Sequence, residues 1–258
     1  CANLYFPFRD SAGASLLAGF LREHVASEIE AVTAIELEYE ASDPSLRPAL
    51  LLGEIDGGRG AGQTSPDVAF EVRTSVGPGV VLVESKFTEH HFYPCSGRKK
   101  TPGGRAPNPD TTRCLDPVAV LRSPQSQCHL TTWGREYWKH LAPVADPATM
   151  SDLKCCPAAF DAYQLFRQHA LAEALAASGA FAKVFSCVAF DSRNGDLMHC
   201  LDRSTGIADI ELGWNQLFKG RSRFIAFTHQ RWVSWVASHA SQERATWLGY
   251  IRERYDIP

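Results

Sequence analysis

The stretch Val80-Val81-Leu82-Val83-Glu84-Ser85-Lys86 decides the fold, because a run of apolar, mostly β-branched residues ends abruptly in polar ones. Four apolar residues in a row are typical of a strand that is buried on both faces of a sheet. Gly77-Pro78-Gly79 marks a tight turn before it, and residues 67–73 alternate apolar and polar side chains before that turn. Residues 67–87 therefore predict a β-hairpin whose second strand lies inside the sheet.

Hydrophobic spacing predicts the elements around this hairpin. Helices are expected over residues 11–35, 158–178 and 232–255, with Gly179 as a candidate C-cap. Strands are expected over residues 35–39, 49–55, 183–190 and 225–227. The order of these elements indicates one α/β domain over residues 1–258, with a mixed central sheet flanked by helices. Residues 95–157, rich in Cys, Gly and Pro, are interpreted as an irregular insertion with a short helix near residues 133–141.

Composition narrows the function classes. The chain has 258 residues, a formal net charge of −3 and eight cysteines. Proteins that coat nucleic acid non-specifically are usually more basic, so any contact with nucleic acid requires a local concentration of positive charge. No apolar run approaches the roughly 20 residues that span a bilayer, and no signal peptide is apparent at the start. We therefore expect a cytoplasmic protein with no membrane partner.

Asp67, Glu84 and Lys86 form the candidate chemical site. Glu84 and Lys86 are two residues apart on one predicted strand, so their side chains point to the same face. The turn before that strand folds Asp67 back beside Glu84. Two carboxylates are a sufficient protein anchor for Mg²⁺, which keeps several waters, and a lysine can orient an attacking water. This pattern favours metal-dependent hydrolysis of a phosphodiester bond. The alternative is a strand cap at Asp67 and a solvated Glu84–Lys86 pair.

Pro66-Asp67 followed by Glu84-Ser85-Lys86 matches the motif that names the PD-(D/E)XK nucleases. Four segments resemble a bacterial family of restriction endonucleases: residues 3–8, 36–39, 86–89 and Gln164-Leu165-Phe166-Arg167. The resemblance implies a restriction-endonuclease-like fold and Mg²⁺-dependent cleavage of DNA, with Mn²⁺ as a substitute and a role in restriction or defence. It implies that Gln164 supports Asp67, Glu84 and Lys86. It also implies a third metal ligand, for which Glu38 is the first candidate and Glu28 the second. Gln164 as a plain helix-surface residue and Glu38 as a solvent-facing residue remain the alternatives.

The insertion carries two further candidate sites. Cys95, Cys114, Cys128 and Cys155 could hold a structural Zn²⁺ or an iron–sulfur cluster, but the chain has no CxxC pair, so buried free thiols remain the alternative. Arg98, Lys99, Lys100 and Arg105 lie shortly after Lys86 in a Gly- and Pro-rich stretch. These cations could contact phosphates, or they could belong to a solvated loop.

Two other classes of function stay open at this point. One is a nucleic-acid-binding module of the same fold that has lost catalysis, which the complete Asp67, Glu84 and Lys86 set argues against. The other is a Cys-rich structural metalloprotein. The recognised sequence, the strandedness of the substrate and a homodimeric state are not determined by the sequence.

Overall fold

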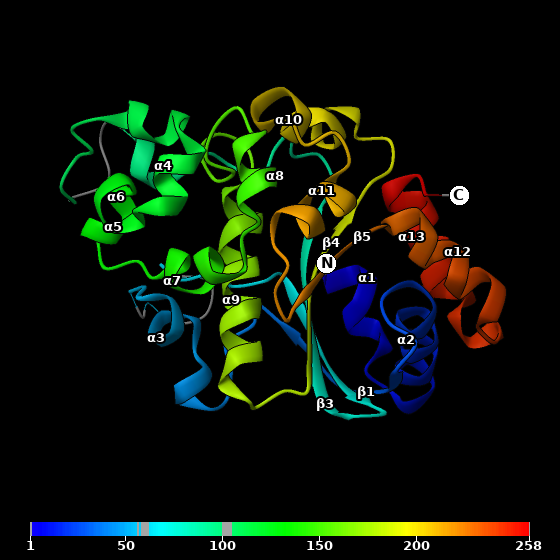
Figure 1. The fold of residues 1–258 in the computed structure, drawn as a ribbon. Coiled ribbons are helices and arrows are strands. Elements are labelled where there is room, and N and C mark those ends of the chain that lie inside the picture. The colour runs from blue at the N-terminus through cyan, green and yellow to red at the C-terminus, as the bar shows by residue number, and fades with distance from the viewer. Residues whose placement is uncertain (1, 56, 58–61, 100–104, 258) are drawn as a thin grey trace.

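A five-stranded mixed sheet forms the centre of the molecule. The computed structural model describes residues 2–55, 57, 62–99 and 105–257. The strands lie in sequence order, and the first three pair antiparallel whereas β3, β4 and β5 pair parallel. Helices cover the sheet on both sides (Figure 1), which confirms the expected α/β class. The strands are β1 (Ile29–Leu37), β2 (Val68–Thr74), β3 (Gly77–Lys86), β4 (Lys183–Phe190) and β5 (Arg223–Thr228).

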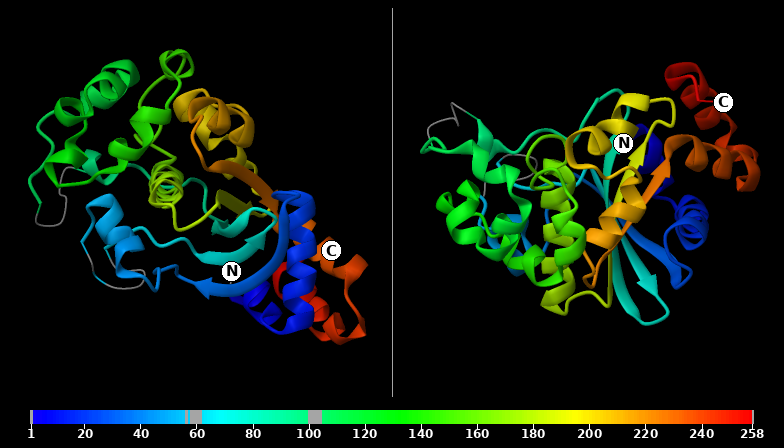
Figure 2. Two further views of the ribbon diagram at one scale, coloured as in Figure 1. Left: turned by 60° about the horizontal axis from the view of Figure 1, so that its bottom comes forward. Right: turned by 45° about the horizontal axis from the view of Figure 1, so that its top comes forward.

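The two faces of β3 enter two different hydrophobic clusters. Val80 and Leu82 belong to the cluster built around helix α9 (Tyr163–Ser178), whereas Val81 and Val83 belong to the cluster on the opposite face. This alternation follows from the two-residue period of a strand. It confirms that the second strand of the hairpin is buried on both faces. Figure 2 shows the same layering from two further sides. The second face is covered by α1 (Ala2–Tyr5), α2 (Ser11–His24), α12 (His229–His239) and α13 (Ala245–Tyr255).

Two predicted elements have the wrong type. Residues 29–35 belong to strand β1 and not to the helix predicted over residues 11–35, because that helix, α2, ends at His24. Their apolar side chains continue the helical spacing, but β-branched residues fit a pleated sheet edge better. Residues 48–52 form helix α3 (Pro48–Leu52) where a strand was expected. Pro48 begins this helix, and Gly53, with φ of 60°, ends it in the left-handed region.

The insertion is more regular than expected, because short helices cover most of its described residues. Several of these helices, among them α4, α5 and α6, lie away from the sheet and form a lobe at the upper left of Figure 1. Polar residues cap the N-termini of several of these helices. Asp116 and Asp146 are examples, because their carboxylates accept hydrogen bonds from backbone amides of the first turn. The elements are η3 (Ser96–Arg98), η4 (Thr111–Leu115), α4 (Pro117–Arg122), α5 (Pro124–Gln127), α6 (His129–Thr132), α7 (Tyr137–Leu141), η5 (Ala142–Val144) and α8 (Pro147–Ser151).

The C-terminal third also differs from the prediction. Two helices that were not predicted, α10 (Gly195–Thr205) and α11 (Ile210–Leu217), connect β4 to β5. The single helix expected over residues 232–255 is broken after His239 into α12 and α13. The break lets Trp232 and Trp247 both pack edge-on against Phe8, each at a ring distance of 4.8 Å. The remaining short turns are η1 (Phe6–Phe8), η2 (Pro44–Leu46) and η6 (Gln242–Arg244).

Candidate active site

The hairpin places Asp67 beside the end of β3. Val68 pairs with Val83 across the two antiparallel strands, so Asp67 lies next to the position of Glu84. The Asp67 carboxylate accepts a hydrogen bond from the backbone amide of Ser85 at 2.8 Å. This bond fixes the carboxylate at the strand end that carries Glu84 and Lys86. The structure therefore brings the three predicted residues of the motif together.

Glu84 is held by two donors at one carboxylate oxygen. Lys86 Nζ lies 2.9 Å from Glu84 Oε1, and the side-chain amide of Gln164 donates to the same oxygen at 2.7 Å. Glu84 and Lys86 are almost fully buried, with exposed fractions of 6% and 3%. A solvated Glu84–Lys86 pair is therefore wrong. Gln164, half-buried, points at the site and is not a plain helix-surface residue.

Burial dominates the electrostatics of this pair. Burial and, less strongly, the nearby charge of Asp67 raise the pKa of Glu84 to about 7, although the charge of Lys86 lowers it. Burial lowers the pKa of Lys86, but the carboxylates of Glu84, Glu89 and Asp67 together outweigh burial and keep the pKa raised. Lys86 therefore stays an ammonium ion. A site that resists the ionisation of one of two adjacent carboxylates is suited to an added positive charge.

The chain that follows β3 positions the first turn of helix α9. The first amides of a helix have no partner within the helix. Here Tyr163 N–H donates to the carbonyl of Tyr93 at 3.1 Å, and Gln164 N–H donates to the carbonyl of Phe92 at 2.9 Å. These bonds tie the start of α9 to the segment that leaves the strand end. Gln164 consequently reaches Glu84 although 80 residues separate them.

The two further acidic candidates lie apart from this cluster. Glu28 makes an ion pair with Lys183 at 3.1 Å, and Lys183 pairs with Gly79 at the far end of the sheet from Lys86. Seven residues of strand separate the two ends, or about 23 Å. Glu28 is therefore not at the site. Glu38 donates its backbone amide to the carbonyl of Asp67 at 3.1 Å, but its side chain is exposed.

The donor set at the strand end fits a magnesium ion. Asp67 and Glu84 are hard oxygen ligands, and Mg²⁺ commonly binds through one or two carboxylates while keeping its waters. Across residues 2–55, 57, 62–99 and 105–257, no group of three or more His, Cys, Asp or Glu side chains is arranged to hold a metal ion. In this structure Glu38 does not complete a third ligand.

The cysteines do not form the expected metal centre. Cys95, Cys114, Cys128 and Cys155 are all buried free thiols within the cluster around α9. Cys155 Sγ contacts the carbonyl of Ser204 at 3.3 Å. Because the described part of the chain gathers no three cysteines at metal-binding geometry, the structure does not support a zinc or iron–sulfur site on these four residues.

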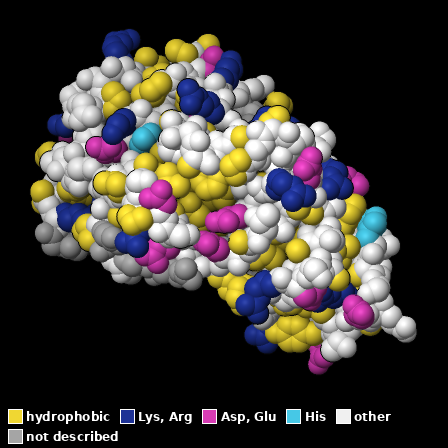
Figure 3. Space-filling view, turned by 90° about the horizontal axis from the view of Figure 1, so that it is seen from below, with side chains coloured by type: hydrophobic (Ala, Val, Ile, Leu, Met, Phe, Trp, Pro, Cys, Tyr) yellow, Lys and Arg dark blue, Asp and Glu magenta, His cyan; other side chains and the backbone are white. Residues whose placement is uncertain are grey.

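The basic stretch after the strand divides into two parts. Arg98 turns inward, donating to the carbonyl of Thr111 at 2.5 Å and lying 4.4 Å from the Phe160 ring centre. Lys99 and Arg105 instead line a cavity beside Gln164. Lys100 lies outside the described residues. Basic and acidic side chains are interspersed on the face shown in Figure 3, so positive charge is not concentrated there.

Sequence reasoning missed four residues around the site. Glu89 lies 3.7 Å from Lys86 Nζ, and its carboxylate accepts the amides of the two residues after Lys86. Its spacing three residues after the lysine was a usable signal. Tyr93, Arg135 and Arg167 line the cavity. Arg167 follows Gln164 by three residues on one helix face, which was also visible in the sequence. Nothing in the sequence selects Tyr93 or Arg135.

Comparisons with known proteins agree with the motif. No helix among the described residues has the length and apolar character needed to cross a membrane. Neither a curated protein nor a solved structure matches the chain. Residues 1–256 match the model of a family described as "Restriction Endonuclease associating with ARP". A match over nearly the whole chain confirms the resemblance to restriction endonucleases. The chain belongs to this restriction endonuclease family.

Proposed function

We propose that this protein is a Mg²⁺-dependent endonuclease that hydrolyses phosphodiester bonds of DNA. The observation that carries the proposal is the convergence of Asp67, Glu84 and Lys86 at the end of one buried strand. Family membership supports a DNA substrate and a role in restriction or defence. Mn²⁺ is expected to substitute for Mg²⁺, because both accept carboxylate and water ligands.

Each residue has a role that its environment supports. Asp67 and Glu84 would hold the metal, with Glu38 able to join only if its exposed side chain turns inward. A bound Mg²⁺ would supply activation of a water and neutralisation of charge on the phosphate. Lys86, a buried ammonium, would orient the attacking water or donate to a phosphate oxygen as negative charge develops. Gln164 would keep the Glu84 carboxylate in one orientation.

The test is cleavage of supercoiled plasmid and of single-stranded DNA in Mg²⁺, Mn²⁺ or EDTA. Wild type is compared with Asp67→Ala and Lys86→Met, and with Lys219→Met as a control. Lys219 is 60% exposed and pairs with Asp146 at the surface, so its loss removes an equal charge away from the site. Both site variants should lower the cleavage rate by a factor on the order of 100 or more, and the control should not.

Two results would contradict the proposal. Cleavage that survives in EDTA, or that persists in both site variants, would show that the nuclease acts elsewhere or is a contaminant. Metal-independent DNA binding without cleavage in any of the three solutions would instead favour a catalytically inactive binding module. The molar mass from light scattering on the same samples, with and without DNA, tests whether the protein is a homodimer.

A further inference from the structure

A cavity of about 490 Å³ opens beside the candidate active site, within the size range of small-ligand pockets. Two residues connect it to the catalytic group. Gln164 lines the cavity and donates to Glu84, and Tyr93 lines it with its ring 5.6 Å from Lys86 Nζ. A molecule that enters the cavity is therefore next to the carboxylates and the lysine of the strand end.

The lining of this cavity is strongly basic. The residues of the described ranges that line it include four cations, Lys99, Arg105, Arg135 and Arg167, and one carboxylate, that of Glu54. Among the described residues, none of the four cations makes an ion pair with an acidic side chain. The described lining therefore carries an excess of positive charge, four cations against one carboxylate, which favours an anion.

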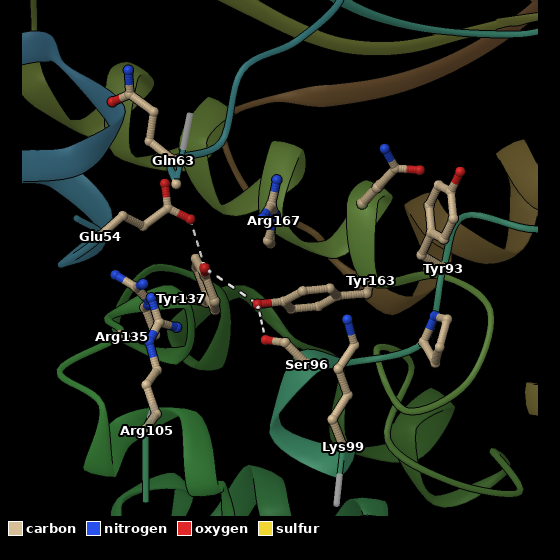
Figure 4. Close-up of a pocket in the computed structure, with 13 residues that line it drawn as sticks. Glu54, Gln63, Tyr93, Ser96, Lys99, Arg105, Arg135, Tyr137, Tyr163 and Arg167 are labelled. Carbon is tan, nitrogen blue, oxygen red and sulfur yellow. Dashed lines mark hydrogen bonds between the residues drawn. The ribbon is translucent and has the colours of Figure 1, made fainter. Parts of the chain in front are cut away.

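The one carboxylate is already engaged by its neighbours. Tyr137 donates its hydroxyl to Glu54 at 2.6 Å, and Thr64 donates to the same oxygen at 2.8 Å. The chain of hydrogen bonds continues through Tyr163 to Ser96 (Figure 4). Glu54 thus holds one wall of the cavity together, and its charge, like that of Glu84, also stabilises the charged form of Arg167.

Arg167 offers the clearest donor to a bound anion. Its guanidinium lies 5.2 Å from the Tyr163 ring centre, and Figure 4 shows it projecting from α9 into the cavity. Its Nε is buried and has no hydrogen-bond partner among the described residues. An arginine is always charged, and a buried donor left unpaired costs free energy. A phosphate group would satisfy this donor with a charge-assisted bond.

Tyr93 offers an aromatic surface at the mouth of the cavity. Its side chain is 48% exposed, so its ring is accessible to a ligand. Its φ of 60° is costly for a residue other than glycine, and such strain often occurs at functional sites. Hydrogen bonds hold the backbone there, from Tyr93 N–H to His91 Nδ1 and from Tyr163 N–H to the Tyr93 carbonyl. An exposed, rigid aromatic ring beside a basic groove is suited to stacking on a base.

We propose that this cavity holds one unpaired nucleotide of the strand that is cleaved. Arg167 and the neighbouring arginines would bind its phosphate, and Tyr93 would stack on its base. The proposal rests on the proposed nuclease function and adds the substrate class: single-stranded DNA, or duplex DNA with an unpaired nucleotide at the cleavage point. An intact base-paired duplex cannot place a base in a cavity without unstacking it.

Binding is measured first, in EDTA, so that metal-dependent cleavage does not intervene. Fluorescence anisotropy compares a labelled single strand with the blunt duplex of the same sequence, for wild type, Arg167→Gln, Tyr93→Leu and Tyr93→Phe. Arg122→Gln is the matched control, because Arg122 is an exposed residue of the insertion outside the cavity lining. Far-ultraviolet circular dichroism and thermal unfolding verify that each variant is folded.

The single strand should bind wild type about tenfold or more tightly than the duplex. Arg167→Gln and Tyr93→Leu should each weaken binding of the single strand about tenfold. Tyr93→Phe, which keeps the ring, should stay within about twofold, as should the control. Equal binding of strand and duplex, or folded Arg167 and Tyr93 variants with unchanged affinity, would overturn the proposal.

Competition with deoxyadenosine monophosphate tests whether the cavity binds a free nucleotide or a nucleotide within a DNA strand. If the variants lose affinity for the free nucleotide but not for the strand, the cavity takes a free nucleotide and the proposal fails. Cleavage assays in Mg²⁺ separate this failure from that of the nuclease. If DNA is cleaved but the variants do not change binding, only the proposed role of the cavity is contradicted. If the variants weaken binding but no DNA is cleaved, the nuclease function is contradicted and the nucleotide-binding cavity is retained.

Discussion

The side-chain amide of Gln164 lies 2.7 Å from Glu84 Oε1, on a carboxylate that is 80 residues earlier in the chain. Lys86 Nζ forms an ion pair with the same oxygen at a distance of 2.9 Å. With two donors on one oxygen, the carboxylate has a fixed orientation before any metal binds. Helix α9 and strand β3 are therefore joined at the point where the chemistry is proposed to occur.

Replacement of Gln164 tests whether this orientation matters. Gln164→Leu keeps the size of the side chain but removes the donor to Glu84. Loss of a residue that orients a metal ligand typically lowers metal affinity or activity by about 10- to 100-fold. We expect the Mg²⁺ concentration for half-maximal cleavage to rise by such a factor. A drop in cleavage with an unchanged Mg²⁺ requirement would assign Gln164 a role other than holding Glu84.

Glu84 should make the stability of the metal-free protein depend on pH. Its pKa rises from 4.5 to about 7 on folding because of burial, so the folded state binds the proton more tightly than the unfolded state. This contribution is complete below pH 4.5 and is lost as the pH rises through 7, by about 3 kcal/mol at most. Urea unfolding in EDTA should show wild type losing stability relative to Glu84→Gln over this range.

The same pair of proteins tests the metal site without an activity assay. At pH 8, Mg²⁺ should raise the melting temperature of wild type, because a ligand that binds only the folded state stabilises it. Glu84→Gln should show a smaller rise or none. An equal effect of Mg²⁺ on both proteins would argue against Glu84 as a ligand.

His169 should impose the opposite pH dependence. It is fully buried on α9, with its ring 5.4 Å from that of Phe218 and with neither ring nitrogen hydrogen-bonded among the described residues. Burial lowers its pKa from 6.5 to about 4, against the charge of Glu173. The unfolded chain therefore binds a proton first, and stability is lost as the pH falls from 6.5 through 4.

The variant His169→Leu isolates this effect. Between pH 7 and pH 4.5, wild type should lose about 2–3 kcal/mol more in free energy of unfolding than the variant does. Denaturant unfolding at the two pH values measures the difference. Parallel losses in the two proteins would show that His169 does not titrate as its burial indicates.

Gly53 tests the wall of the cavity. It ends α3 at φ of 60°, and its carbonyl accepts a hydrogen bond from Arg135 at 2.5 Å. A Cβ at this position would overlap the carbonyl oxygen of Gly134. Gly179 also has a positive φ, of 79°, but has open space where a Cβ would be. Gly53→Ala should therefore lower the free energy of unfolding by at least about 2 kcal/mol, and Gly179→Ala by only about 1 kcal/mol. Equal losses would show that backbone strain alone, and not the clash with Gly134, limits this position.

Some features were determined by local sequence alone. The apolar run before Glu84 predicts a buried central strand, and a period of two residues places Glu84 and Lys86 on one face. The turn itself lies at residues 75–76, because the predicted turn residues Gly77–Gly79 belong to β3. It still fixes Asp67 beside them, since a tight hairpin leaves little freedom in strand register. The three residues of the proposed catalytic set were therefore predictable, since they lie within 20 residues and depend on one hairpin.

Other features were decided only by tertiary packing. Residues 29–35 and 48–52 have apolar patterns that fit either type of element, so their neighbours in the fold determined the outcome. The basic cavity joins Glu54, Arg105 and Arg167 from three distant segments. No local pattern encodes such a meeting, because it arises from how separate elements pack. The sequence by itself determined the hairpin that carries the carboxylates and the lysine; the packing of α9 and the insertion against it decided what surrounds them.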